Sequence, residues 1–413
     1  MLIRNLQVIN HISHREIRAR IGPYPLWFRH NDLTAENETD ASPFLISALI
    51  PAMLLGENIE VHDDLSVSTQ LLESIPTIQT IINHWNPIFK PIVVNSRSYS
   101  NMNSASERAA FFSAGVDSLY TAIRHSDKLN ALILINGFDF NMDSITWQDM
   151  VARNNELAQL LNKRLILVET NLKEFTSWFR LSRYANFGAS LATVANLLNI
   201  AEAHISGHVT YDKISPAGAH PLLDPLWSTE GCSIFHTGLE ADRTGKLELI
   251  KHSPVLLSKL WVCWKNPKNN CGECSKCIRS YLAMQLCGID NFNFEHSVHL
   301  DQVRKLTIED DEMLSFFENF RKDALDRDMH ELSKTLSRVI FRYKTRKYFL
   351  DIDKFLLGSK LKRLRNTGKT AVRDLADISV LPRVSDRVVL GELRSIHQER
   401  SAVNSTESIG TVF

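Results

Sequence analysis

Residues 109–126 read AAFFSAGVDSLYTAIRHS, an apolar run followed by a turn of small residues and an amphipathic segment. The run 109–112 has the length and bulk of a buried strand, and residues 113–115 interrupt it. From Asp117 onward the apolar residues recur at helical spacing, and Asp117 or Ser118 is suited to capping the helix. Free N–H groups at the start of a helix attract anions. The segment therefore predicts a strand, a turn and a helix that together bind an anion.

Length and composition are those of a globular protein. The chain has 413 residues, which favours roughly two to three domains. Its 47 Lys and Arg residues balance its 47 Asp and Glu residues, so the whole chain carries no charge bias toward nucleic acid or anionic membranes. No apolar stretch approaches the roughly 20 residues that span a bilayer, and the first residues lack the features of a signal peptide. We therefore expect a soluble, cytoplasmic protein with no membrane partner.

The N-terminal residues 1–104 are predicted to form a small α+β unit. Strands are expected at 2–9, 16–21, 26–29, 58–61 and 92–94, and helices at 43–55 and 71–85. Pro76 is expected to kink or restart the second of these helices. His11 and His14 lack an accompanying cluster of His or Cys, so we interpret them as surface residues.

Residues 105–295 alternate apolar strands with helices. After the strand at 109–112, strands are expected at 131–135, 165–168 and 203–206, with helices from Asp143 or Ser144 to Leu161 and at 187–198. This order predicts an α/β fold with a doubly wound parallel sheet, which binds ligands at the carboxyl ends of its strands.

Several residues directly follow these strands. Ser113, Asn136, Thr170 and Gly207 are therefore expected to gather along one edge of the sheet. Beyond them, His208, Thr210 and Asp212 offer polar groups for a ligand or for loop hydrogen bonds. In the loop that follows, His220, Asp224 and Trp227 suit either a flat or polar substrate or a plainly packed loop. The sequence leaves both alternatives open.

The loop at 113–118, Ser-Ala-Gly-Val-Asp-Ser, resembles the Ser-Gly-Gly-x-Asp-Ser pyrophosphate loop of the adenine nucleotide alpha hydrolase superfamily. The resemblance implies that the chain binds ATP and cleaves it between the α- and β-phosphates, with the adenine near the end of the second strand. Ala114 departs from the family pattern, because it replaces the first glycine. If that position needs a positive φ or close phosphate approach, the extra methyl would weaken ATP binding.

Four cysteines form the second motif, Cys263-x7-Cys271-x2-Cys274-x2-Cys277. Four thiolates at this spacing suit a tetrahedral zinc ion, and with all positions filled by protein the ion would be structural. An iron–sulfur cluster is the alternative, because it also takes four thiolates.

The two motifs together resemble the 7-cyano-7-deazaguanine synthase family. Arg279 and the segment Ser-Pro-Val-Leu-Leu-Ser-Lys at 253–259 add to the resemblance, which covers about residues 107–287. It implies a ligase-type enzyme that adenylates a carboxylate or an amide with ATP and Mg²⁺, after which a nitrogen nucleophile displaces AMP. Extended relatives in bacterial defence or biosynthetic systems imply a divergent substrate, for which a protein or peptide carboxylate is a candidate.

The resemblance also assigns roles to residues. Asp117 would orient the loop or Mg²⁺, Ser118 would bind pyrophosphate, and Lys259 would neutralise phosphate charge during catalysis. The nucleotide-binding set is Ser113, Ala114, Gly115, Val116, Asp117, Ser118, Asn136, Gly137 and Gly207.

Residues 296–413 are predicted to form a helical extension with a flexible tail beyond Arg400. Its stretch 338–373 is rich in Lys and Arg with interleaved aromatic residues, which suits RNA binding, a protein partner or a solvated helical face. Two further hypotheses follow. The protein could be a tRNA base-modifying adenylating enzyme, or a scaffold that binds a nucleotide without cleaving it. Sulfur transfer would require Cys232 or Cys287, the cysteines outside the metal set.

Overall fold

The computed structural model describes most of the chain. The described residues are 1–32, 39–100, 105–138, 144–357 (apart from 183, 199, 264, 267, 291, 293 and 310), 391 and 393–398. Three sequence predictions lie outside the described residues. They concern Asp143, the part of the basic stretch at 358–373, and the tail beyond Arg400.

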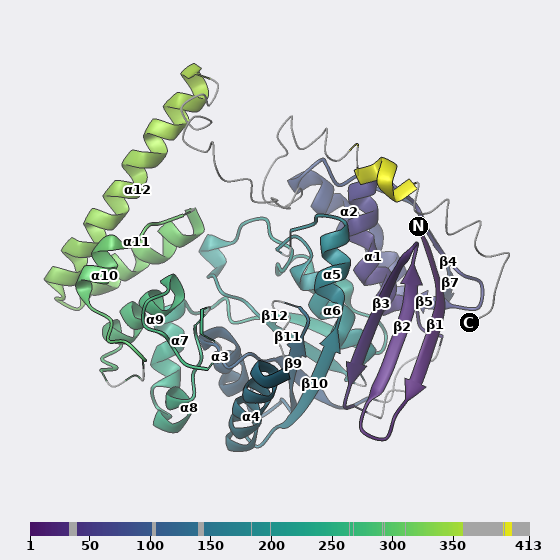
Figure 1. Ribbon diagram of the computed structural model, residues 1–413, viewed down its shortest axis with the longest axis horizontal. Coiled ribbons are helices and arrows are strands. Elements are labelled where there is room, and N and C mark those ends of the chain that lie inside the picture. The colour runs from purple at the N-terminus through teal and green to yellow at the C-terminus, as the bar shows by residue number, and fades with distance from the viewer. Residues whose placement is uncertain are drawn as a thin grey trace. The chain divides into compact units, whose positions relative to one another are not determined.

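The chain forms two compact units (Figure 1). The sheet unit comprises Met1–Ser113, Thr121–Leu239 and the described residues near the C-terminus, and the helical unit comprises Ala114–Tyr120 and the chain from Glu240 onward. Helix α3 (Val116–Arg124) begins in the helical unit and ends in the sheet unit.

A ten-stranded mixed sheet organises the sheet unit. Its order is β12-β11-β8-β9-β10-β3-β2-β1-β4-β6, and a separate pair joins β5 to β7. The strands are β1 (Leu2–Asn10), β2 (Arg15–Ile21), β3 (Tyr24–His30), β4 (Ile59–Val61), β5 (Ser66–Ser68), β6 (Val94–Asn95), β7 (Arg97–Tyr99), β8 (Arg108–Phe111), β9 (Ala131–Asn136), β10 (Arg164–Thr170), β11 (Glu202–Ser206) and β12 (Ser233–Thr237).

The strands β12, β11, β8, β9 and β10 are all parallel, as the alternation of strands and helices predicts. The chain adds β9 and β10 on one side of β8 and then returns to add β11 and β12 on the other side. The strand order therefore reverses between β8 and β11. Ligands of doubly wound sheets bind at such a reversal, outside the carboxyl ends of the strands.

The N-terminal strands extend this same sheet, although the sequence predicted a separate α+β unit at 1–104. Strand β3 pairs antiparallel with β10, with Glu169 opposite Arg29, and β2 and β1 continue the sheet beyond it. Figure 1 shows β10, β3, β2 and β1 side by side. The boundary predicted at residue 104 thus falls inside one compact unit, because the edge of the parallel sheet is covered by strand pairing.

Helices cover the sheet, and their buried side chains form the hydrophobic core together with those of the strands. The helical segments of this unit are α1 (Ser42–Leu55), α2 (Thr69–Trp85), α4 (Ser144–Leu160), α5 (Leu172–Trp178), α6 (Phe187–Leu197) and the short 3₁₀ turns η1 (Tyr211–Lys213) and η2 (Asp224–Trp227). Every residue of α1 is buried, which explains why its sequence is apolar on all sides. Pro76 lies inside α2, which continues through it as one helix.

The segment 393–398 belongs to the sheet unit, although the sequence placed it in a C-terminal extension. Arg394 donates to the carbonyl of Leu54, and His397 Nε2 lies 2.7 Å from Glu57 Oε2. These contacts fix the segment against residues near the end of α1.

The stability of the fold depends on pH through a buried histidine in β11, His204. His204 stacks on Phe235, and its buried ring nitrogens have no hydrogen-bond partner, although Nε2 lies 3.9 Å from Glu202 Oε2. Its other charged neighbours are His125, Lys128 and Arg108. Burial, with a smaller contribution from His125, lowers the pKa of His204 from 6.5 to about 4. The folded state therefore binds this proton less readily than the unfolded state.

We expect acid to destabilise the protein through this group. Because the pKa of His204 is lower in the folded state, stability should fall as the pH drops from about 6.5 toward 4. The variant His204→Phe should lose less free energy of unfolding between pH 7 and pH 5 than the wild type, as urea denaturation would measure. An equal loss would contradict this assignment. His84→Gln, at an exposed position in α2, is the control.

The helical unit contains α7 (Arg243–Ile250), α8 (Pro254–Ser258), α9 (Ser275–Leu286), α10 (Leu300–Lys305), α11 (Asp311–Asp326) and α12 (His330–Leu357). Basic residues of α12 hold this unit together. Arg342 and Arg346 donate to backbone carbonyls near the end of α10 and beyond it, while Lys344 and Lys347 pair with Glu318 and Asp311. These four basic residues thus make contacts within the helical unit.

None of the helices in the described part of the chain combines the length and apolar character needed to cross a membrane.

Candidate functional site

The turn between β8 and α3 has an unusual backbone conformation. Ala114 is buried and has φ = 57°, in the left-handed region that favours glycine. Its carbonyl accepts a hydrogen bond from the N–H of Trp261 at 2.9 Å. Ala114 thus adopts the positive φ that the sequence analysis named as one condition under which the extra methyl would weaken ATP binding.

Replacing Ala114 with glycine should therefore stabilise the protein. A left-handed alanine costs about 1–2 kcal/mol, part of which glycine recovers, so we expect the free energy of unfolding to rise by roughly 1 kcal/mol. Urea denaturation measures the change. Ala122→Gly, inside α3, is the matched control and should lower the free energy of unfolding by roughly 1 kcal/mol. A loss of stability in Ala114→Gly would show that the left-handed conformation is not maintained.

Helix α3 begins at Val116, one to two residues earlier than the sequence predicted. Asp117 and Ser118 therefore lie in its first turn and not at the cap. The Ser118 hydroxyl donates to the carbonyl of Gly115 at 3.2 Å. A carboxylate in the first turn is favoured by the helix dipole.

The carboxylate of Asp117 binds two cations from α7. Its Oδ1 lies 2.9 Å from Lys246 Nζ, and its Oδ2 lies 3.0 Å from an Arg243 guanidinium nitrogen. The Lys246 side chain is only 1% exposed, and its ammonium lies 5.8 Å from the centre of the Tyr120 ring. Asp117 is thus held firmly, with two positive charges beside the loop that carries it.

Arg243 and Lys246 were missed by the sequence analysis. Asp242 precedes them and caps α7 by accepting the N–H of Gly245 at 2.9 Å. Lys246 lies three positions after Arg243, so both side chains lie on one helix face. A helix-capping Asp followed by two basic residues on one helix face was the sequence pattern that could have indicated them. The sequence does not indicate which carboxylate these two residues bind.

Lys259 is the C-terminal capping residue of α8, and its side chain is half-buried. Two residues later the N–H of Trp261 donates to the carbonyl of Ala114, so the segment that carries Lys259 lies next to the loop.

In the sheet unit, the remaining predicted binding residues follow the parallel strands. Ser113 is exposed beyond β8, and Asn136 ends β9. Gly137 has φ = 85°, and a Cβ there would meet the Thr170 carbonyl oxygen at 1.7 Å, so only glycine fits. A Cβ on Gly207 would meet Leu239 and His236 at 2.7 and 2.8 Å. Gly207 thus permits close packing against Leu239 and against His236 of β12.

The loop before β12 is packed into the protein. His220, Asp224 and Trp227 are all buried, and burial and nearby His236 lower the pKa of His220 to about 4. Trp227 belongs to the hydrophobic core, which supports the interpretation of a packed loop. Nearby, Thr210 donates to Asp212 at 2.6 Å, a local loop hydrogen bond.

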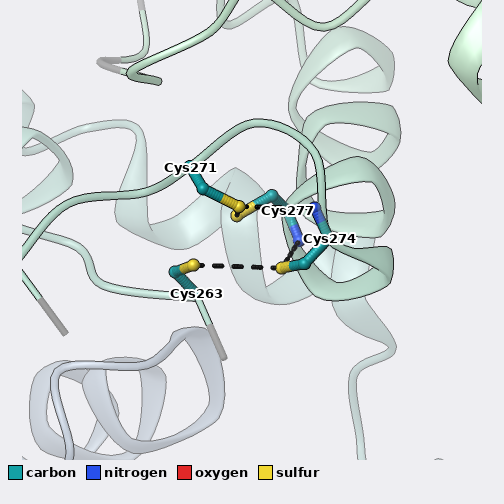
Figure 2. Close-up of side chains that lie close together, drawn as sticks. All are labelled: Cys263, Cys271, Cys274 and Cys277. Carbon is teal, nitrogen blue, oxygen red and sulfur yellow. Dashed lines mark hydrogen bonds between the residues drawn. The ribbon is translucent and has the colours of Figure 1, made fainter. Parts of the chain in front are cut away.

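The four predicted metal-ligating cysteines come together in the helical unit. Figure 2 shows Cys263, Cys271, Cys274 and Cys277 with their sulfur atoms facing one another. All four residues are buried, and their sulfurs lie within 4.8 Å of one another. The pairs 263–274 and 271–277 are each 3.9 Å apart.

These distances match a single tetrahedral ion. Zinc–sulfur bonds of about 2.3 Å place tetrahedral sulfurs about 3.8 Å apart. A multi-iron cluster would hold the sulfurs further apart, because several metal atoms lie between them. The four cysteines could therefore hold one zinc ion, and the geometry favours zinc over the iron–sulfur alternative.

Backbone N–H groups surround the sulfurs. The sulfur of Cys263 accepts from Lys265 and Asn266 at 3.3 and 3.2 Å, and that of Cys274 accepts from the N–H of Cys277 at 3.4 Å. Such donors offset the charge of bound thiolates. The hydrogen bond with Cys274 and burial raise the pKa of Cys277, so a metal ion would have to replace its proton.

Cys232 and Cys287 are the two cysteines outside this cluster. Both are buried, and burial raises the pKa of each to about 12. They are neutral thiols near pH 7 and weak nucleophiles. This argues against sulfur transfer through either residue.

Comparison of the chain with protein-family models, with curated proteins and with solved structures gives no match. The function is therefore inferred from the residues and the fold alone.

Proposed function

We propose that the protein is an ATP-dependent enzyme that cleaves ATP to AMP and pyrophosphate and adenylates a carboxylate or an amide. The observation that carries the proposal is the position of the 113–118 loop. It follows β8, the strand at which the order of the parallel sheet reverses, and it opens α3. A loop at this point presents helical N–H groups to a phosphate. The fold would then be that of the adenine nucleotide alpha hydrolases.

The loop residues take the following roles in this proposal. The N–H groups of 113–118 and the hydroxyls of Ser113 and Ser118 bind pyrophosphate. Asp117 fixes the loop through Lys246 and Arg243. Because both carboxylate oxygens already bind cations, Asp117 fits this positioning role better than that of a ligand for Mg²⁺, which would arrive with the phosphates of ATP.

Charge stabilisation is the chemical contribution of this arrangement. Cleavage between the α- and β-phosphates leaves negative charge on the departing pyrophosphate, which Lys246, Arg243 and Lys259 would stabilise. Asn136 and Gly137 would lie near the adenine. The zinc ion would supply only structural support, since four cysteines fill its coordination shell.

The test uses α-labelled ATP with Mg²⁺ and fractions of cell extract that contain either small molecules or RNA. We expect labelled AMP with a small-molecule fraction and its loss in Asp117→Ala. ADP in place of AMP would overturn the assignment. AMP formation with the RNA fraction alone would favour tRNA base modification.

A nucleotide-binding scaffold is the second candidate, and one observation favours it. Ala114 places a strained, methyl-bearing residue in the loop where the related family has glycine. A scaffold would bind ATP measurably but release neither AMP nor ADP with any fraction of the cell extract. The variant Ala114→Gly would then show no turnover either.

A further inference from the structure

A carboxylate–imidazole pair lies inside the sheet unit, apart from the residues assigned above. Asp224 Oδ2 and His236 Nδ1 are 2.6 Å apart. The Asp224 side chain is fully buried, and that of His236 is 5% exposed. The two residues come from η2 and from β12, which contact each other.

Burial and hydrogen bonding act in opposite directions on the ionisation of Asp224, and together they raise its pKa. Its Oδ1 accepts the N–H of His220 at 3.2 Å. The same oxygen lies against the first turn of α6, where a Cβ on Gly188 would approach it to 2.3 Å. Burial raises the pKa of Asp224, whereas the hydrogen bond from His236 and the N–H of His220 lower it. The N-terminal end of a helix also favours a carboxylate.

When Asp224 is ionised, its 2.6 Å contact with Nδ1 fixes the tautomer of His236. The shared proton then resides on Nδ1, and Nε2 carries the lone pair. Among the described residues, Nε2 has no hydrogen-bond partner, and it is not one of the enclosed nitrogens such as those of His204 and His30. His220 is the other titratable group facing the pair.

Nε2 lies near the carboxyl ends of β11 and β12. His236 pairs with Ile205 in the parallel register, one residue before β12 ends. A Cβ on Gly207 would meet Nε2 at 2.8 Å, so this nitrogen lies beside the first residue beyond β11. Strand β11 borders the reversal of strand order, and its carboxyl end belongs to the edge where doubly wound sheets bind ligands.

We propose that His236 is the general base of the nitrogen-transfer step, with Asp224 as its positioning residue. This proposal rests on the proposed function and adds a catalytic base to it. The nitrogen nucleophile attacks the acyl carbon of the adenylate, and a carbon–nitrogen bond forms. The bond from that carbon to the AMP oxygen breaks, and its electron pair leaves with AMP. The proton of the attacking nitrogen passes to Nε2, and Asp224 stabilises the imidazolium.

The test compares two nucleophiles in the variant His236→Gln. Full-length protein receives α-labelled ATP, Mg²⁺ and the small-molecule fraction that supports AMP formation, with either ammonium chloride or hydroxylamine. Hydroxylamine attacks acyl adenylates without needing a general base. At pH 7 we expect the variant to lose AMP formation with ammonia by about 10²–10⁴-fold and to keep it with hydroxylamine. Raising the pH should recover part of the ammonia rate.

A matched control is His62→Gln. His62 makes a similar hydrogen bond to Asp64, at 2.5 Å, but both side chains are more than half exposed. This variant should match the wild type with both nucleophiles. Equal ammonia rates in His236→Gln and the wild type would overturn the inference while leaving the proposed function intact. Loss with both nucleophiles would also overturn it, by placing His236 in adenylation or in folding. No AMP from the wild type would overturn the proposed function and this inference with it.

A second measurement does not depend on the substrate. Nitrogen-15 NMR of the histidine rings should show His236 protonated on Nδ1 near pH 7. In Asp224→Asn the amide can donate to Nδ1, so the proton should move to Nε2. A wild-type His236 protonated on Nε2 would contradict the role of a base.

Discussion

Cys274→Ser is expected to abolish zinc binding and to unfold the region around α9. Cys274 contributes one of four sulfurs, and its side chain also accepts the N–H of Cys277 at the start of α9. Serine is a poor zinc ligand, and a structural zinc site contributes on the order of 10 kcal/mol to local folding. The wild type should contain one zinc per chain by mass spectrometry, and the variant none. Limited proteolysis should then cleave the variant in the helical unit.

Cys287→Ser is the control for this prediction. Cys287 ends the same helix and donates to the carbonyl of Thr244 at 3.4 Å, a hydrogen bond that serine can also make. This variant should retain its zinc and its resistance to protease. Iron and sulfide in the purified wild type would instead indicate an iron–sulfur cluster. Unchanged folding after complete chelation would exclude a structural metal.

The metal centre could be predicted from sequence because its ligands are close in the chain. Four cysteines within fifteen residues leave few geometries, so their spacing alone brings the sulfurs together. The parallel strands were predictable for a similar reason. Each is a short apolar run followed by small or polar residues, and the structure confirms the strands predicted at 131–135, 165–168 and 203–206 to within one to two residues at each end.

Long-range pairing could not be predicted in this way. Strand β3 joins β10, and about 140 residues separate the two partners. Nothing in the local pattern of either strand identifies the other, so residues 1–104 looked like a separate unit. The same limit applies to the pair formed by Asp224 and His236. The sequence indicated Asp224 as a candidate but not the histidine in β12 that binds it.

At the proposed nucleotide site, the contacts of Asp117 could not be predicted from the sequence either. Its place in the motif was evident, but Lys246 and Arg243 follow it by more than 120 residues. Only the fold brings these charges together, and of the two roles predicted for Asp117 their positions favour the one that orients the loop. The proposal gains two cationic residues that the motif alone could not supply.

Lys246→Met is expected to reduce AMP formation by about 10²–10³-fold, the usual effect of removing one charge-stabilising donor from an active site. Methionine replaces the buried chain of Lys246 with a similar volume, so the loss arises mainly from the missing ammonium. Asp117 keeps Arg243 as a partner at 3.0 Å, which should preserve the fold of the loop. Labelled ATP turnover gives the rate, and urea denaturation verifies that the variant is folded.

Lys251→Met is the matched control, because Lys251 caps the C-terminus of the same helix and pairs with Glu248 at a partly exposed position. It should turn over ATP at the wild-type rate. If Lys246 only supported the fold, its variant would lose stability and rate together. If it acts on phosphate, the rate falls while the free energy of unfolding stays close to that of the wild type. A folded Lys246→Met protein with full turnover would remove this lysine from the site, and the charge on pyrophosphate would then depend on Arg243 and Lys259.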